Sequence, residues 1–182
     1  PIVYSRPDEP EWGFNSSVTE DGRYLVITIW KGTDSKYRVV YRDLEEPYAA
    51  PVELITDFEH EYSFVGSDGP VFYFETDRDA PRRKLVAVDI RRPDHADHQE
   101  LIAESDDTLS NVSIVHNQFV ATYLRHAQTH VAIYCKDGRH ARDVELPGVG
   151  TAAGFGGRPG DTETFYAFTS FAVPTAIYRY DM

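Results

Sequence analysis

The chain has 182 residues, 41% of them hydrophobic and 26% charged, and its 18 basic and 30 acidic residues give a formal charge of −12. That negative balance argues against nucleic acid and against an anionic membrane surface as partners, because both are polyanions. No uncharged apolar run approaches the ~20 residues that a membrane-spanning helix needs. The single cysteine, Cys135, excludes a disulfide framework within the chain.

The first ten residues contain neither an initiator methionine nor the apolar core of a signal peptide. We therefore expect the chain to be an internal part of a longer protein. The lack of disulfides and of a leader favours a cytoplasmic location for that protein, with the periplasm as the alternative.

Short runs of β-branched and aromatic residues follow one another along the chain and predict strands. The clearest of these runs are 24–30, 71–74, 119–124 and 164–168. Between them lie clusters of Gly, Pro, Asn and Asp, and both Asp21-Gly22 and the segment 67–69 suit tight hairpins. The segment 98–109 fits a short helix, but it fits an outer strand equally well.

An aspartate follows or ends a strand at a regular interval: Asp43, Asp89, Asp137 and Asp181 are spaced by 46, 48 and 44 residues. A period in the mid-forties that carries several strands is typical of β-propeller blades. We therefore predict an all-β fold, a partial β-propeller of about four blades of four-stranded antiparallel sheets. The expected blades of this single propeller segment are 12–57, 58–105, 106–147 and 148–182. The last blade is one strand short, so we expect the chain to be truncated.

Motifs for nucleotide binding and for hydrolysis are weak or missing. The sequence has no GxSxG nucleophile elbow and no phosphate-binding loop. The segment 148–153 matches a loose dinucleotide pattern, but the glycines that follow it cannot open a helix. It is better interpreted as an inner strand whose glycines let blades approach closely.

Metal and carboxylate chemistry receive little more support. His126 and His130 would share a face only on a helix, so they are interpreted as loop histidines, as is the polar cluster 94–98. We predict no metal site, no cofactor and no catalytic residue in the chain. Neighbouring carboxylates leave a propeller glycosidase as a weaker alternative, because that chemistry needs two carboxylates about 5–10 Å apart in one cleft. These carboxylates are Asp8, Glu9, Glu11, Glu20, Asp21, Glu45, Glu46, Glu59, Glu61, Asp106 and Asp107.

The last expected blade carries the most specific motif, DTETFYAFTSFAVP at 161–174 followed by IYRYD at 177–181. This motif is very similar to the end of the propeller in the prolyl oligopeptidase family. Pro10-Glu11-Trp12 with 19–24 resembles a middle blade of that family, and the segments 58–62 and 74–81 continue the match. The resemblance covers essentially the whole chain and implies roughly blades four to seven of a seven-bladed propeller.

In that family the propeller caps an α/β-hydrolase domain, whose Ser-Asp-His triad cleaves short peptides after proline. The resemblance implies that this chain is the gating, substrate-access segment of such a serine endopeptidase. Its expected partners are the hydrolase domain of the same protein and proline-containing oligopeptides. The triad itself would lie outside the chain.

Three positions align with residues that line the substrate cavity of the family. Gly13 stands where some members have methionine, Trp30 where an arginine reaches the peptide, and Thr33 where a cysteine borders the site. None of the three keeps the residue of those members. Trp30 either offers a peptide an apolar platform or packs as an ordinary blade aromatic. Asp34 and the turn 30–33 are expected at the contact between domains.

A second class of function is a stand-alone propeller module that binds peptides or protein partners. If the segment is prepared alone, we expect self-association through its open blade edges, because unpaired strands and exposed apolar faces are costly in water.

Overall fold

The computed structural model describes residues 2–94 and 97–182. Within these ranges the chain forms fifteen β-strands, arranged in four antiparallel sheets. The all-β prediction and the partial propeller are therefore confirmed, including a last sheet of three strands. No helix in the described part of the chain is long and apolar enough to span a membrane.

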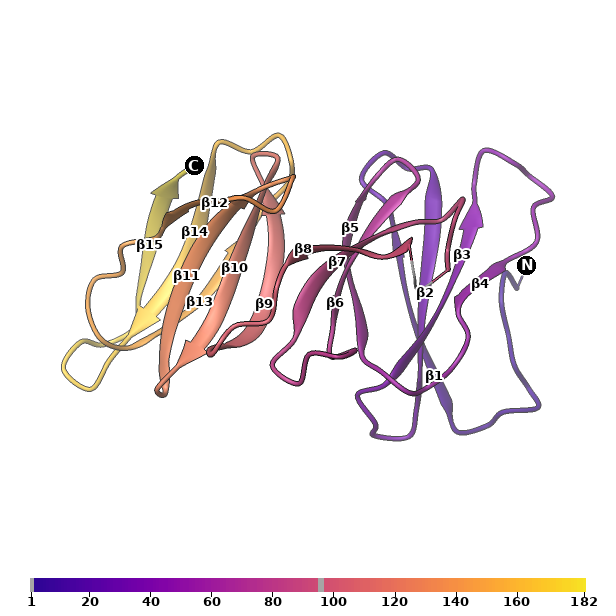
Figure 1. Ribbon diagram of the computed structural model, residues 1–182, viewed down its shortest axis with the longest axis horizontal. Helices are drawn as coiled ribbons and strands as arrows, with labels where there is room; N and C mark the ends of the chain where they lie inside the picture. The colour runs from indigo at the N-terminus through magenta and orange to yellow at the C-terminus, as the bar shows by residue number, and fades with distance from the viewer. Residues whose placement is uncertain (1, 95–96) are drawn as a thin grey trace. The chain divides into compact units, whose positions relative to one another are not determined.

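Each sheet is a meander, in which the strands lie side by side in chain order (Figure 1). The first sheet contains β1 (Trp12–Val18), β2 (Tyr24–Lys31), β3 (Tyr37–Asp43) and β4 (Val52–Ile55). The second contains β5 (Tyr62–Asp68), β6 (Val71–Thr76), β7 (Lys84–Asp89) and β8 (Gln99–Ile102). The third contains β9 (Thr108–Val115), β10 (Gln118–Arg125), β11 (Gln128–Cys135) and β12 (His140–Asp143). The last contains β13 (Thr151–Gly156), β14 (Glu163–Thr169) and β15 (Ala176–Asp181).

Three of the four recurrent aspartates, Asp43, Asp89 and Asp137, cap the turn that follows the third strand of a sheet. Asp43 Oδ1 accepts a hydrogen bond from Glu45 N at 2.9 Å, and Asp89 Oδ1 accepts one from Arg91 N at 3.0 Å. Asp137 repeats the arrangement with the amide two residues further on. A short carboxylate that binds its own backbone in this way stabilises a turn against a continuing strand. The period seen in the sequence is therefore a period of strand ends.

The chain divides into two compact units, which comprise the described residues of 1–78 with 87–98 and of 79–86 with 99–182. In the first unit, aromatic rings fill the space between neighbouring sheets. The rings of Tyr24 and Tyr41 meet Phe72 edge to face, with centroid distances of 5.3 and 5.7 Å. Such pairs each add about 0.5–1.5 kcal/mol beyond the area they bury. The opposite face of the first sheet buries a second cluster, built on Ile27, Ile29 and Val40 and covered by Tyr4, Trp12, Leu25 and Phe58.

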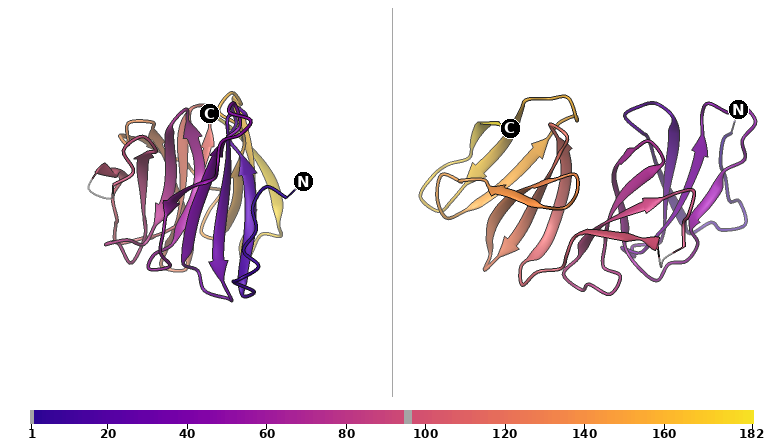
Figure 2. Two further views of the ribbon diagram at one scale, coloured as in Figure 1. Left: turned by 90° about the vertical axis from the view of Figure 1, so that its right-hand side faces the viewer. Right: turned by 45° about the horizontal axis from the view of Figure 1, so that its top comes forward.

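In the second unit, the sheet β9–β12 and the sheet β13–β15 lie face to face, as both Figure 1 and the right panel of Figure 2 show. Their shared core includes Val115 and Ile133 on one side and Phe155 and Phe168 on the other. The ring of Phe155 stacks on Tyr166 with a centroid distance of 4.4 Å and an interplanar angle of 11°. This packing buries the apolar faces that no single sheet could bury alone.

Candidate functional site

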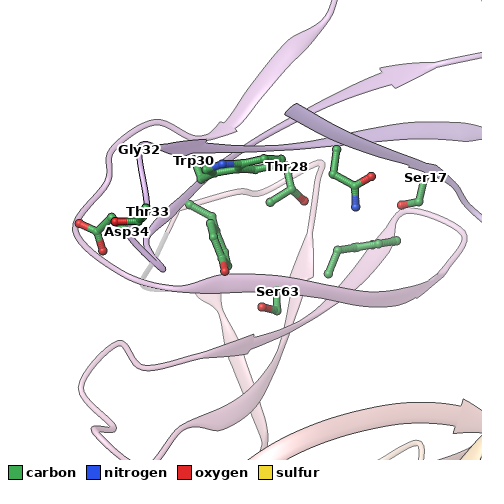
Figure 3. A pocket seen from close by; sticks show the side chains of 10 residues that line it. Ser17, Thr28, Trp30, Gly32, Thr33, Asp34 and Ser63 are labelled. Carbon is green, nitrogen blue, oxygen red and sulfur yellow. The ribbon is translucent and has the colours of Figure 1, made fainter. Parts of the chain in front are cut away.

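A groove of about 640 Å³ opens beside the innermost strands of the first unit. Its walls come from β1, β2, the hairpin between β2 and β3, the first residue of β3, and β5 (Figure 3). The described residues that line it are Asn15, Ser17, Thr28, Trp30, Gly32, Thr33, Asp34, Tyr37, Ser63 and Phe64. All ten belong to one unit, so the groove is formed within a single compact body.

Strand register places the groove residues on one face of the first sheet. Trp30 pairs with Gly13 on β1 and with Tyr37 on β3, so these three positions form one row across the sheet. The next row along β1 pairs Asn15 with Thr28. Toward Tyr24 and Tyr41, the same face carries the aromatic packing described above. Asn15, Ser17 and Thr28 on this face are small and polar. Because these side chains do not fill the space toward β5, a groove remains.

Gly13 is the reason that the Trp30 indole can lie over β1. A Cβ atom at position 13 would overlap the indole Cε2, Cζ2 and Nε1 atoms. Figure 3 shows the ring lying flat along the strands. Trp30 is half-buried, so one part of the ring system faces the groove. The pair Gly13–Trp30 thus forms a flat aromatic floor that a side chain on residue 13 would displace.

Backbone hydrogen bonds fix the hairpin at the end of this floor. Gly32 has a φ of 58°, a left-handed conformation that glycine adopts without strain, and its amide donates to Glu11 O at 3.1 Å. The amide of Asp34 donates to Lys31 O at 3.2 Å, and Tyr37 N donates to His60 O at 3.0 Å. The loop that carries Thr33 and Asp34 is therefore anchored on both sides.

The groove has one charged lining residue, Asp34, which makes no ion pair with a described cation. The neighbouring Lys31 is instead directed to Glu11, with 3.7 Å between Nζ and Oε2. Among the residues that the structure describes, none accepts a hydrogen bond from the indole N–H of Trp30. The groove thus combines an aromatic surface, a free indole donor, a carboxylate and several hydroxyl groups.

The structure brings the three sequence-predicted site residues together. Trp30 and Thr33 line the groove, and Gly13 lies directly beneath Trp30. The remaining lining residues on β1, β2, β3 and β5 were not predicted from the sequence. One signal for β1 was available, because Gly13, Asn15 and Ser17 alternate as small residues along one strand face. The contribution of β5 had no local signal, since it depends on packing between sheets.

A second groove, of about 490 Å³, lies in the other unit, beside the hairpin between β10 and β11. Val149 and Phe171 contribute to its walls and are strongly exposed. His126 and Ala127 form its turn with φ values of 47° and 61°, so the loop is shorter than the sequence suggested and His130 lies within β11. This groove has no aspartate, glutamate, lysine or arginine among its described lining residues.

Metal ligands do not converge in the described residues, where no group of three or more His, Cys, Asp or Glu side chains could hold an ion. His130 Nε2 lies 3.6 Å from Asp143 Oδ1, and His126 is in the turn. His95 of the 94–98 cluster lies outside the described residues.

Most of the carboxylates that left a glycosidase as an alternative make local contacts. Asp107 Oδ2 lies 2.6 Å from Arg125 Nε, and Glu61 Oε1 accepts a hydrogen bond from Ser63. One shallow depression of about 420 Å³ does contain two carboxylates, Asp161 and Glu163. Asp161 Oδ2 accepts a hydrogen bond from Arg158 N at 2.8 Å, and Glu163 Oε2 lies 3.6 Å from Arg179. Each carboxylate is thus held by its own neighbour.

The most perturbed tyrosines serve packing and do not titrate near neutral pH. Burial raises the pKa of Tyr73 to about 12. Burial, followed by the hydrogen bond to the Tyr134 hydroxyl at 3.0 Å, raises the pKa of Tyr123. Neither phenol lines the groove under Trp30.

Comparison with known families adds an independent line of observation. Residues 1–182 match the family model described as the prolyl oligopeptidase N-terminal β-propeller domain. A prolyl endopeptidase of Elizabethkingia miricola is 33% identical over 165 residues, which cover 91% of this chain and 23% of that protein. A dual-function macrocyclase-peptidase of Galerina marginata is 26% identical over 185 residues, covering 99% of this chain and 25% of that protein.

Solved structures agree with the sequence matches. A prolyl endopeptidase structure superposes with a TM-score of 0.88 and 33% identity, covering 98% of this chain and 26% of the other. Prolyl oligopeptidase B from Galerina marginata, bound to a 35-residue hydrolysis and macrocyclization substrate, superposes with a TM-score of 0.91 and 27% identity. That match covers 100% of this chain and 26% of the other. The chain therefore spans about a quarter of the length of these relatives.

Proposed function

The chain belongs to the prolyl oligopeptidase family, of whose N-terminal propeller it forms a part, and we propose that it is the substrate-access wall of a serine endopeptidase that cleaves short peptides after proline. The observation that carries this proposal is the match of all 182 residues to the family's propeller domain. In this assignment the catalytic Ser-Asp-His triad belongs to an α/β-hydrolase domain of the same protein.

The open surfaces of the segment support a place in a larger ring. On the last sheet, Phe165 is 52% exposed and Ile177 is 71% exposed. Both lie on the face of that sheet opposite Phe155, Tyr166 and Phe168, which are buried. An apolar sheet face needs a neighbour to exclude water. A further blade packed on this face would satisfy that need.

The residues that line the groove favour a role in peptide binding. The groove under Trp30 offers ring contacts and hydrogen bonds, which bind a peptide, and its described lining residues include no histidine or cysteine. We propose that proline-containing oligopeptides contact this wall while the hydrolase domain performs the reaction. The peptide complex of the Galerina marginata enzyme supports this role, because that relative is described as bound to a 35-residue substrate.

The test uses the complete gene product that contains this segment. Its purified form should cleave a short internally quenched peptide after proline, and should be inactivated by a serine-directed phosphonate. A peptide with alanine in place of proline is the matched control substrate. A folded protein with exposed proline-containing loops should resist cleavage, because the propeller restricts access. Peptide binding without any cleavage would contradict the proposal and would identify a binding module instead.

A related proposal concerns the segment prepared alone. The exposed face that contains Phe165 and Ile177 should then drive self-association, because nothing covers it. Size-exclusion chromatography with light scattering should give a mass above that of one chain, and a Phe165→Ser, Ile177→Ser double variant should reduce it. A compact monomer at high concentration would overturn this proposal.

A further inference from the structure

Three hairpins of the chain contain the sequence Asp-Gly, at 21–22, 68–69 and 137–138. In such a sequence the backbone amide nitrogen of the glycine can attack the side-chain carboxyl carbon of the aspartate, because glycine has no side chain to block the approach. The five-membered succinimide ring that results opens to isoaspartate. The fold decides which of the three sequences reacts, since the attack needs an amide nitrogen that is free to turn toward the carboxyl group.

Two of the three hairpins hold this amide in place. The amide of Gly22 donates a hydrogen bond to Thr19 O at 2.8 Å, and the amide of Gly138 donates one to Cys135 O at 2.9 Å. Gly138 is also packed against the backbone of β8, because a Cβ atom there would overlap the carbonyl group of Leu101. Neither amide can turn toward its aspartate without breaking a backbone hydrogen bond.

The carboxylates of these two hairpins are held as well. Asp21 Oδ1 accepts hydrogen bonds from the Thr19 hydroxyl and from Arg23 N, and Asp137 Oδ1 accepts one from Arg139 N at 3.0 Å. The hydrogen bond from Thr19 lowers the pKa of Asp21, so a smaller fraction of this carboxyl group carries the proton that leaves with its oxygen as water. Both aspartates are therefore protected at the attacking nitrogen and at the attacked carbon.

The hairpin between β5 and β6 is built differently. Asp68 is the last residue of β5 and pairs with Val71, the first residue of β6, so Gly69 and Pro70 form a two-residue turn. Gly69 has a left-handed φ of 53°, and a Cβ atom at this position would meet nothing within 4 Å. Within residues 2–94 and 97–182, no carbonyl oxygen accepts a hydrogen bond from the Gly69 amide. The anchored atom of the turn is Pro70 O, which accepts a hydrogen bond from Ile90 N at 3.0 Å.

The exposed side chain of Asp68 contacts the buried Tyr73. The Tyr73 hydroxyl donates a hydrogen bond to the Asp68 carboxylate, and burial, which raises the pKa of Tyr73 to about 12, keeps this phenol protonated at neutral pH. The bond engages a carboxylate oxygen and leaves the backbone amide of Gly69 unrestrained. The attacking nitrogen of this hairpin is therefore freer than its counterparts in the other two.

We propose that Asp68 is a modification site, at which the folded protein forms isoaspartate much faster than at Asp21 or Asp137. The new bond joins the Gly69 nitrogen to Cγ of Asp68, and the bond that breaks joins Cγ to a carboxyl oxygen. This oxygen leaves as water, with the proton of the amide and the proton of the carboxyl group. Water then adds to the ring: opening at Cγ restores aspartate, and opening at the main-chain carbonyl carbon gives isoaspartate.

The modification changes the geometry of a hairpin that supports the core. Isoaspartate lengthens the main chain by one methylene group at the point where β5 enters the turn. The length of a two-residue turn fixes the register of its strands. That register pairs Phe64 of β5 with Phe72 of β6 at a centroid distance of 5.5 Å, and Tyr62 with Phe74 at 5.9 Å. The modified hairpin cannot keep both its turn and this register unchanged.

The experiment incubates the complete gene product at physiological temperature and neutral pH and follows each Asp-Gly sequence over time. Peptide mapping by mass spectrometry, with an endoproteinase that cleaves before aspartate but not before isoaspartate, measures the modified fraction at each position. Methyl transfer from S-adenosylmethionine by an isoaspartyl methyltransferase measures the total independently. Isoaspartate should form about fivefold faster at Asp68 than at Asp21 or Asp137, the factor that one net backbone hydrogen bond provides.

The same protein in denaturant is the reference state. Without the fold, the three sequences differ only in their flanking residues and should react at similar rates, so the preference for Asp68 should fall toward unity. Equal rates at the three positions of the folded protein would overturn the proposal. A preference for Asp68 that persists unchanged in denaturant would also overturn it, because the sequence alone would then explain the preference.

Matched variants separate the backbone from the carboxyl group. Asp68→Asn, Asp21→Asn and Asp137→Asn close the same ring with release of ammonia, so their rates do not depend on the protonation of a carboxyl group. Asp68→Asn should again react fastest. Asp68→Glu should stop the modification at this position, because its longer side chain would have to close a larger ring. If Asp21→Asn or Asp137→Asn reacts as fast as Asp68→Asn in the folded protein, the role assigned to the free Gly69 amide is wrong.

Discussion

The first strand of the first sheet, β1, and the first strand of the last sheet, β13, occupy the same place in their meanders, and both contain glycines. In β1, Gly13 makes room for a side chain, since a Cβ there would overlap the Trp30 indole. In β13, Gly154 makes possible a backbone conformation, because its φ is 122° and a Cβ would lie 2.8 Å from the carbonyl oxygen of Phe165.

The irregular backbone of β13 orients one core ring. The register between β13 and β14 shifts between Gly154 and Gly156, and the intervening Phe155 has a φ of 60°. A left-handed conformation in a bulky residue costs about 1–3 kcal/mol and persists only where its surroundings impose it. Here Phe155 is 1% exposed and stacks on Tyr166, so the bulge directs the ring into the core of the second unit.

Glycines in corresponding strands of two sheets thus act on different properties of the protein. The glycine of β13 supports folding, because it permits the bulge that places Phe155. The glycine of β1 supports the candidate site, because it permits the aromatic floor. Substitutions at the two positions should therefore separate stability from peptide binding.

The largest effect is expected for Gly154→Ala. The new Cβ meets backbone atoms that cannot move independently, and the backbone conformation is strained for alanine. We expect the free energy of unfolding to fall by about 2–4 kcal/mol, which combines backbone strain with overpacking. Urea unfolding monitored by tyrosine and tryptophan fluorescence measures it. An unchanged unfolding midpoint would contradict the role assigned to the bulge.

The next effect is expected for Gly13→Ala, and mainly on binding. The backbone at residue 13 is not in the left-handed region, so the cost of the substitution is displacement of the Trp30 ring. We expect the peptide affinity to fall about as much as in Trp30→Ala, roughly three- to tenfold, while the unfolding free energy changes by less than about 1 kcal/mol. A large loss of stability with unchanged binding would contradict the claim that Gly13 of β1 affects binding and Gly154 of β13 affects stability.

A smaller effect distinguishes the capped strand ends of the two units. Arg91 Nη2 lies 2.6 Å from Asp89 Oδ2, whereas Arg139 Nε is 4.0 Å from Asp137 Oδ2. Hydrogen bonds from Arg91 lower the pKa of Asp89 to about 2. Since this folded-state pKa is below the unfolded value of about 4, the stabilisation is fully present above about pH 4 and is lost as the pH falls toward 2.

Asp89→Asn should therefore lower the unfolding free energy at pH 7 by up to about 1 kcal/mol, and more than Asp137→Asn does. The difference between wild type and the Asp89 variant should shrink as the pH falls and disappear only below about pH 2. Urea unfolding at several pH values tests this, and a difference that grows in acid would reverse the sign of the argument.

The smallest effect is expected for Gly156→Ala, which is the matched control for both glycine predictions. A Cβ at position 156 meets nothing within 4 Å, and no left-handed backbone is required there. Stability should stay constant or rise slightly, by about 0.4–1 kcal/mol, because alanine restricts the unfolded chain. A marked loss would indicate that β13 tolerates no side chain at any of its glycines.

Much of the fold could be predicted from local sequence. The run 24–30 became β2 and the run 119–124 lies within β10, because continuous β-branched and aromatic residues are stable only in a pleated, doubly buried strand. The ambiguous segment 98–109 forms β8 and the start of β9, so the strand interpretation was correct.

The candidate site was predictable in part. Trp30 and Thr33 were identified by resemblance to a family, and the structure places both at one groove. The significance of Gly13 depends on its register opposite Trp30, and the contribution of Ser63 depends on how β5 packs against the first sheet. Neither relation is encoded within one strand, so no local pattern reveals it.

The sequence by itself determined the strands, the capped turns that recur in the mid-forties, and hence four successive antiparallel sheets, because these features depend on residues close together in the chain. Only the tertiary structure decided that Gly13 underlies an aromatic floor, that Asp34 beside it makes no ion pair with a described residue, and that Phe155 enters the core through a bulge. These depend on cross-strand register and on packing between sheets, where a shift of one residue would turn each side chain to the opposite face.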